Sequence, residues 1–210
     1  MADYKKPEHW QIKARKEGYP ARSVYKLKEI DEKFGLFKAP RLQGSRNIRI
    51  LDIGAAPGSW SLYVLRKMAV SGKGFLAAAD LSPLSREFDN GLFDGDNFHF
   101  IQGDITEAPI REAILSKSPY SVIISDVAPN TTGNHMVDSA RSLELAETVI
   151  EYAQSALAPG GNLAVKIFQG SGTDTLLKHI KTLFKTAKSF KPEACRGESV
   201  ETYFIGLEKR

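Results

Sequence analysis

The fold of this 210-residue chain follows most directly from the stretch Ile50-Leu51-Asp52-Ile53-Gly54-Ala55-Ala56-Pro57-Gly58-Ser59-Trp60. An apolar run that ends in Asp-x-Gly-x-x-x-Gly predicts a buried strand that turns tightly into a helix. Gly54 and Gly58 allow a positive φ and a close approach of a ligand, and a helix that begins near Ser59 offers unpaired N–H groups. This junction is typical of a nucleotide site in an α/β protein.

The same loop departs from the dinucleotide-binding pattern Gly-x-Gly-x-x-Gly at two positions. Ala56 stands at the middle glycine, and Pro57 lacks an N–H donor where a pyrophosphate would bind. We therefore expect an adenosine ligand that carries no phosphate. S-adenosylmethionine (SAM) fits, because its positive sulfonium needs no anion site. For this segment taken alone, an ordinary strand-to-helix turn is the alternative interpretation.

Strand-like and helix-like segments alternate through most of the chain. The predicted strands are 48–53, 74–80, 98–102, 121–126, 162–168, 188–191 and 202–207. The predicted helices are 59–68, 107–116, 138–157 and 174–186, with a Gly- and Pro-containing break at 158–161. The alternation predicts an α/β fold in which helices cover both faces of a mostly parallel, seven-stranded sheet. We place a boundary in the loop 42–47, between an N-terminal arm (1–42) and the core (43–210) of one compact domain.

Four carboxylates end or follow predicted strands, at the edge where parallel sheets bind ligands. They are Asp52, Asp80, Asp104 and Asp126. Asp80 is placed to accept both ribose hydroxyls of an adenosine, and Asp104 to meet its amino group. Either residue alone is also a plausible helix cap. Four carboxylates at one edge favour a ligand site.

Lys166 interrupts an apolar strand, 163–168, that should be buried. Burying an unpaired ammonium costs on the order of several kcal/mol, so this lysine needs a carboxylate partner or a catalytic role. Asp126, near the end of a preceding strand, is the expected partner. A lysine that extends from the strand end into solvent is the alternative.

The charge of the chain is concentrated in the arm. The whole chain has 29 Lys and Arg against 25 Asp and Glu, whereas residues 1–28 alone hold eight basic and three acidic residues, a net charge of +5. Trp10, Tyr19 and Tyr25 lie among these charges as stacking surfaces, so the arm is predicted to contact single-stranded or looped RNA. A second basic row at helical spacing is interpreted as a solvated helix face. Its members are Lys178, Lys181, Lys185 and Lys188.

Cysteine and histidine content argues against several site classes. The single cysteine, Cys195, cannot form an intrachain disulfide or a metal site built of thiolates. The four histidines are widely spaced, so we expect no catalytic metal. We also expect a cytoplasmic protein without membrane association. Cys195 is interpreted as an incidental thiol rather than a nucleophile.

Six segments together resemble one known family over nearly the whole chain. They are 21–27, 52–60, 102–104, 125–130, 165–170 and 199–203. The chain resembles the FtsJ/RrmJ family of SAM-dependent ribose 2′-O-methyltransferases, which implies a Rossmann-like class I SAM methyltransferase fold. The resemblance implies a Lys-Asp-Lys-Glu catalytic tetrad at Lys26, Asp126, Lys166 and Glu201. It also implies SAM contacts at Gly58, Trp60, Asp80, Asp104 and Asp126. The loop residues Asp52 and Gly54 complete the expected cofactor site.

The resemblance implies methyl transfer to RNA, with a uridine of large-subunit (23S) ribosomal RNA as the expected target of a monomeric enzyme. Transfer RNA is the alternative, because Ser59 replaces a glycine common in bacterial members and occurs in eukaryotic tRNA-modifying relatives. A SAM-dependent base methyltransferase and an inactive RNA-binding module are further alternatives. Segment 125–130 lacks the final aromatic residue and the second proline that are typical of base methyltransferases. The presence of both Asp126 and Lys166 argues against an inactive RNA-binding module. Whether Lys166 is a general base or a steering ammonium stays open on the sequence.

Overall fold

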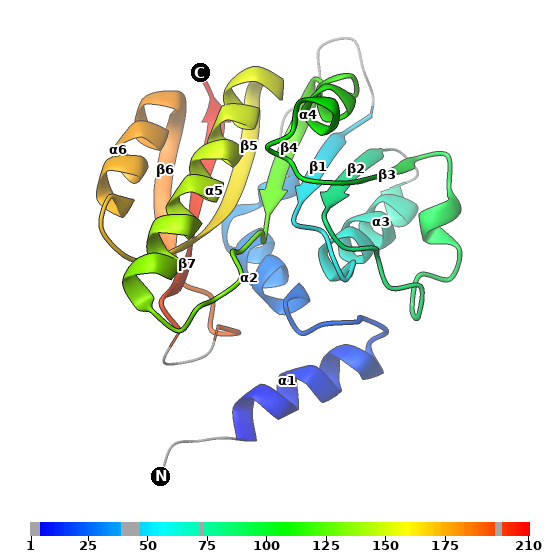
Figure 1. Ribbon diagram of the computed structural model, residues 1–210. Helices are drawn as coiled ribbons and strands as arrows, with labels where there is room; N and C mark the ends of the chain where they lie inside the picture. Colours follow the sequence, from blue (N-terminus) through cyan, green and yellow to red (C-terminus); the bar gives the residue numbers. More distant parts are fainter. Residues whose placement is uncertain (1–4, 39–46, 72–73, 196–198) are drawn as a thin grey trace.

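The computed structural model describes residues 5–38, 47–71, 74–195 and 199–210. The boundary loop predicted at 42–47 lies, apart from Asn47, outside these residues. Seven strands form one sheet in the order β3-β2-β1-β4-β5-β7-β6 (Figure 1). They are β1 (Arg49–Ile53), β2 (Phe75–Asp80), β3 (Phe98–Gln102), β4 (Tyr120–Ser125), β5 (Leu157–Phe168), β6 (Phe184–Phe190) and β7 (Glu201–Lys209). Because only β7 runs antiparallel to its neighbours, the predicted mostly parallel sheet is confirmed.

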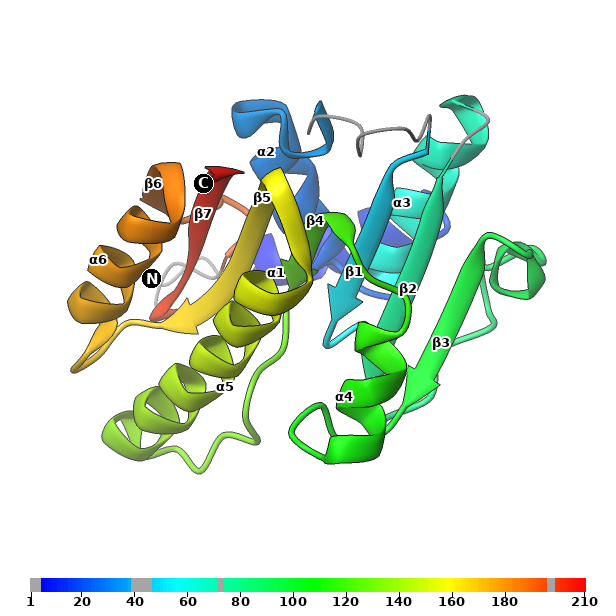
Figure 2. The ribbon, with the colours of Figure 1, turned by 90° about the horizontal axis from the view of Figure 1, so that it is seen from above.

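Helices cover both faces of this sheet, as predicted (Figure 2). One face packs on α1 (Lys5–Lys16), α2 (Val24–Phe34) and α3 (Ser59–Ser71), and the other on α4 (Ala108–Leu115), α5 (His135–Ala156) and α6 (Thr173–Leu183). Short 3₁₀ helices follow α2 at Leu36–Lys38 and precede β3 at Leu92–Asp94. Alternate residues of the central strands enter opposite hydrophobic clusters, which is why these strands read as continuous apolar runs.

The end of α6 differs from the prediction. The helix expected over 174–186 ends at Leu183, and Phe184 begins β6. Phe184 is fully buried against Gly206 of β7, where an added Cβ would lie 2.7 Å from the phenyl ring. Pairing with β7 satisfies the backbone of β6, so this contact, distant in sequence, overrides the helical pattern.

The predicted basic row on one helix is therefore wrong. Two of its lysines, Lys178 and Lys181, lie on α6, whereas Lys185 and Lys188 lie on β6. All four are exposed, and Lys185 pairs with Glu208 at 3.0 Å. The break predicted at 158–161 is also absent as a separate loop. It is an irregularity inside β5, where the register with β4 shifts.

Candidate active site

The loop after β1 passes close to the segment after β4. Gly54 has φ of 76°, and a Cβ at this position would lie 2.5 Å from the backbone of Val127. Only glycine allows this approach. Gly58 has φ of 108°, and a Cβ there would lie 3.0 Å from the ring of Phe93. Helix α3 begins at Ser59 directly after this loop, so the predicted strand-to-helix junction is confirmed.

Asp80 and Asp104 lie at the same edge of the sheet. The Asp80 carboxylate accepts the backbone N–H groups of Ala56 at 2.9 Å and Ser82 at 2.8 Å. Asp104 accepts the N–H and the hydroxyl of Thr106 at 2.8 and 2.7 Å, which lowers the pKa of Asp104. Each carboxylate oxygen has two lone pairs, so both side chains, which are partly exposed, can accept further hydrogen bonds from an adenosine.

Two residues predicted to bind the cofactor have buried side chains. Asp52 is fully buried and accepts the Ser61 hydroxyl at 2.7 Å, while its Oδ1 has no hydrogen-bond partner in the described part of the chain. Burial raises the pKa of Asp52 to about 7. Trp60 is also buried, and its indole N–H donates to the Ser23 carbonyl at 2.8 Å. Only the backbone of Trp60 is left to contact a ligand, and the Asp52 side chain joins β1 to α3 through Ser61.

The four residues expected to form a tetrad come together from distant segments. Lys26 lies on α2, Asp126 follows β4, Lys166 lies on β5 and Glu201 begins β7. The Lys166 Nζ lies 3.1 Å from the Asp126 Oδ1 and donates to the Asp126 carbonyl at 2.6 Å. The Lys26 ammonium forms an ion pair with Glu201. The predicted partner of Lys166 is confirmed, and the alternative of a lysine extended into solvent is wrong, because only 8% of its side chain is exposed.

The tetrad is balanced in charge. Burial alone would lower the pKa of Lys26, but the carboxylates of Asp126 and Glu201 raise it above its usual value. Burial alone would raise the pKa of Asp126, but the ammonium groups of Lys166 and Lys26 lower it. Two basic side chains therefore face two carboxylates, and each of the four has a partner of opposite sign.

Comparison with known proteins identifies the family. A model of the FtsJ-like methyltransferase family matches residues 19–209. The chain belongs to this family. A relative from Treponema denticola, named ribosomal RNA large subunit methyltransferase E, is 47% identical over 205 residues, which cover 98% of this chain and 96% of that protein. A relative of the same name from Oleidesulfovibrio alaskensis is 43% identical over 202 residues, which cover 95% of this chain and 90% of that protein.

Solved structures agree with the FtsJ-like fold. The structure of a ribosomal RNA methyltransferase from Plasmodium falciparum superposes with a TM-score of 0.73 at 26% identity, covering 91% of this chain and 98% of that one. Human methyltransferase-like protein 13, solved with S-adenosylhomocysteine (SAH), has a TM-score of 0.54 at 16% identity, covering 77% of this chain and 72% of that one, and shares the fold. The predicted class I SAM methyltransferase fold and the FtsJ resemblance are thus confirmed.

This FtsJ-like protein is a SAM-dependent methyltransferase, and its residues fit SAM. The glycine loop passes so close to Val127 and Phe93 that a side chain at Gly54 or Gly58 would clash with them. The Asp80 and Asp104 carboxylates lie at the adjoining strand ends. Pro57 and Ala56 supply no pyrophosphate cradle, which suits an adenosine without phosphates.

Tyr203 belongs to the same cluster, although the sequence analysis assigned it no site role. Its buried hydroxyl lies 2.6 Å from the Asp126 Oδ1 and 2.7 Å from the Glu201 Oε1, and its single proton can be donated to either carboxylate. Burial and these two carboxylates raise the pKa of Tyr203 well above its usual value, so it stays a hydroxyl. One signal was available in the sequence: Glu201 and Tyr203 are two residues apart on a strand and share one face.

Cys195 is close to the cluster without having the properties of a nucleophile. Its Sγ lies 3.8 Å from the Glu201 Oε1. Burial, followed by the charge of Glu201, raises the pKa of the thiol to about 12. The thiol is therefore protonated at neutral pH, and a nucleophilic cysteine needs the thiolate.

The arm packs on the core through the aromatic residues that were predicted to stack on RNA. Tyr19 and Tyr25 are 6% and 4% exposed. Lysine and arginine side chains cover their rings: the Lys28 Nζ lies 4.9 Å from the centre of the Tyr19 ring, and the Lys13 Nζ 4.8 Å from that of Tyr25. Tyr19 and Tyr25 are therefore core residues, and their prediction as RNA-stacking surfaces is wrong. Trp10 is partly exposed, and the side chains of Lys5 and Lys6 lie outside the described part of the chain.

Among the described residues, no group of three or more His, Cys, Asp or Glu side chains is arranged to hold a metal ion. None of the helices in this part of the chain is both long and apolar enough to cross a membrane.

Proposed function

We propose that this protein transfers a methyl group from SAM to a ribose 2′-hydroxyl of large-subunit ribosomal RNA, with uridine as the target nucleoside. One observation carries the proposal: the buried Lys166 amine is held 3.1 Å from the Asp126 carboxylate, at the sheet edge that also bears Asp80 and Asp104. The printed names of the relatives that match nearly the full chain support ribosomal RNA as the substrate.

The residues of the tetrad act on the attacking oxygen. SAM, when bound, supplies a methyl group that the 2′-oxygen attacks, and the electron pair of the broken C–S bond stays on the sulfur of neutral SAH. The Lys166 nitrogen directs two of its positions to Asp126, which leaves the remaining position for the ribose 2′-hydroxyl. The Tyr203 hydroxyl contacts the same Asp126 Oδ1 and also Glu201, which forms an ion pair with Lys26. This fixed geometry supplies the positioning that such a displacement needs.

Lys166 is also the proposed acceptor of the hydroxyl proton. Its neutral amine would take the 2′-hydroxyl proton as the new O–C bond forms, and Lys166 would end the step as an ammonium.

The alternatives have less support. The Ser59 hydroxyl, the feature shared with tRNA-modifying relatives, exchanges hydrogen bonds with the backbone N–H and carbonyl of Ala21 at 2.8 and 3.0 Å. It therefore fastens the arm to α3 and carries no argument for tRNA. A base methyltransferase or an inactive binding module would have no use for a buried lysine poised as Lys166 is.

We also propose that the enzyme works as a cytoplasmic monomer without a metal ion, in the compartment where ribosomes are made. The four residues of the tetrad come from one chain, and lysines already neutralise Asp126 and Glu201. Residues 1–42 would contact RNA and residues 43–210 would bind SAM within one compact domain.

Product analysis tests the proposed reaction. The full-length protein is incubated with methyl-labelled SAM and, separately, with large ribosomal subunits and tRNA from cells that lack it. We expect label in a 2′-O-methylated uridine of large-subunit RNA, identified by nucleoside mass spectrometry, and none with the Lys166→Ala variant. Label in a base, or in tRNA alone, would overturn the proposal.

A further inference from the structure

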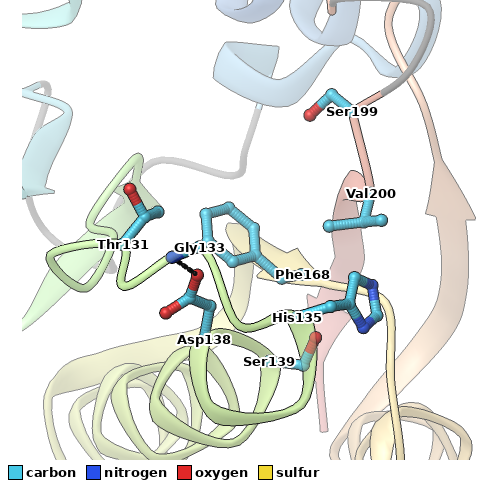
Figure 3. A pocket seen from close by; sticks show the side chains of 8 residues that line it. All are labelled: Thr131, Gly133, His135, Asp138, Ser139, Phe168, Ser199 and Val200. Atoms are coloured by element: carbon cyan, nitrogen blue, oxygen red, sulfur yellow. Dashed lines mark hydrogen bonds between the residues drawn. The ribbon is translucent and has the colours of Figure 1, made fainter.

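A cavity of about 320 Å³ lies at the ends of β4 and β5 (Figure 3). Its walls are the loop 131–135, the start of α5, Phe168 at the end of β5, and the pair 199–200 that precedes β7. The volume is near the lower end of the range of about 300–1,000 Å³ that is typical of small-molecule sites.

The cavity adjoins the tetrad and lies beyond Lys166 toward the end of β5. In the pairing of β5 with β7, Lys166 is opposite Tyr203 and Phe168 is opposite Glu201. Alternate residues of a strand share a face, so Phe168 follows Lys166 on the same face, about 7 Å nearer the open edge. In the sheet order, this side of β4 is opposite to the strands that bear Asp80 and Asp104. A methyl acceptor bound on this side of Lys166 would lie next to the cavity.

Hydrogen bonds hold the cavity walls in place. Asp138, the fourth residue of α5, accepts the N–H and the hydroxyl of Thr132 at 2.8 Å each and the N–H of Gly133 at 3.2 Å. These hydrogen bonds lower the pKa of Asp138 and satisfy its carboxylate. On the facing wall, the N–H of Gln169 donates to the Val200 carbonyl at 2.9 Å. The cavity is therefore largely preformed, as ligand sites are.

The lining suits a flat, uncharged ring. Phe168 offers a partly exposed phenyl face, and hydroxyl or imidazole groups come from Thr131, His135 and Ser199. No lysine or arginine is among the described residues that line the cavity. RNA enzymes commonly hold an unstacked base on an aromatic face and read its polar edge.

We propose that this cavity holds the base of the nucleotide whose ribose is methylated, with Phe168 as its stacking surface. The proposal rests on the proposed function, since it needs an RNA nucleotide whose 2′-oxygen reaches Lys166. The base would lie one residue pair from that lysine, which matches the step from a ribose to its own base. Thr131, His135 and Ser199 would then read the edge of the base.

Kinetics with matched variants test the stacking role. We expect Phe168→Leu to lower kcat/KM for large ribosomal subunits about 5- to 150-fold, the size of one base–aromatic stacking interaction, with an unchanged Kd for SAM. Phe168→Tyr keeps the aromatic face and should stay within about threefold of the wild type. Phe190→Leu removes a partly buried phenylalanine on β6, outside the cavity, and is the control. A wild-type kcat/KM for Phe168→Leu, an equal loss in Phe168→Tyr, or a weakened Kd for SAM would overturn the proposal.

A binding experiment separates this proposal from the proposed reaction. The isotope-labelled full chain is titrated with uridine, cytidine, adenosine and guanosine, and the ring signals of Phe168 and His135 are followed by NMR. We expect saturable shifts of both rings in the wild type and loss of the His135 shift in Phe168→Leu. Absence of shifts at the solubility limit of every nucleoside would refute the cavity as a base site. Shifts without methyl transfer to any RNA would instead refute the proposed reaction.

Discussion

The Tyr203→Phe substitution removes one hydroxyl from the centre of the tetrad and leaves the ring in place. The hydroxyl lies 2.6 and 2.7 Å from two carboxylates and is fully buried. A hydrogen bond to a charged group contributes about 1.5–3 kcal/mol, and a domain of this size loses about 2–4 °C in Tm per kcal/mol. We therefore expect Tm to fall by about 3–12 °C.

The Tyr120→Phe variant is the matched control. Tyr120 is equally buried, and its hydroxyl donates at 2.7 Å to the neutral carbonyl of Ile114, away from the tetrad. Its loss should cost about 0.5–1.5 kcal/mol and leave kcat unchanged. In Tyr203→Phe the two carboxylates lose their shared donor, so Asp126 and Lys166 are less firmly positioned and kcat should fall on the order of tenfold.

Calorimetry and methyl transfer to ribosomal subunits measure both effects in the two variants. Circular dichroism serves as the check on folding, because the Tyr203 hydroxyl contacts Asp126, which is itself a predicted SAM contact. A wild-type kcat in Tyr203→Phe, or the same fall in Tyr120→Phe, would refute the assignment of Tyr203 as a positioning residue.

Three other variants test the remaining parts of the site. Lys166→Arg keeps the positive charge but cannot release a proton near neutral pH, so kcat should fall about 10²- to 10⁴-fold. Activity within tenfold of the wild type would refute Lys166 as the proton acceptor and leave it the role of a cation that steers the hydroxyl. Asp80→Ala should weaken SAM binding by about 1.5–3 kcal/mol in calorimetry, and an unchanged Kd would contradict its ribose contact. The folded-state pKa of Asp52, about 7 against an ordinary 3.8, means that the native state keeps the proton longer than the unfolded chain. The stability contributed by Asp52 is therefore greatest below about pH 4 and falls as pH rises toward 7. In urea unfolding, Asp52→Asn should flatten the dependence of the free energy of unfolding on pH, and an identical dependence would argue against the raised pKa.

Local signals predicted the features of this protein that depend on neighbours in sequence. The glycine spacing at Gly54 and Gly58 marks a turn that only glycine can make so close to another segment. The pairing of Lys166 with Asp126 was predictable because a buried ammonium needs an anion, and parallel strands bring their carboxyl ends to one edge.

Contacts between distant segments explain what the sequence did not predict. Phe184 follows α6 with helical periodicity, but the space above Gly206 and the free edge of β7 make it the start of a strand. An aromatic residue among lysines has the same local pattern whether its ring faces RNA or is covered by those lysines. For Tyr25, the ammonium of Lys13 and the fold of the arm decide in favour of burial.

The arm is better understood as part of the catalytic centre than as an appended binding segment. Figure 1 shows α1 beyond the edge at which β1, β2 and β4 end. The following residues 19–36 enter the hydrophobic cluster that contains Trp60 and Tyr203. Lys26 then reaches Glu201 from α2. Without this lysine, Glu201 and Asp126 would face one ammonium instead of two, and a buried anion would lose its partner at a cost of about 3–5 kcal/mol. The segment proposed to contact RNA therefore also completes the charge balance on which the placement of Lys166 depends.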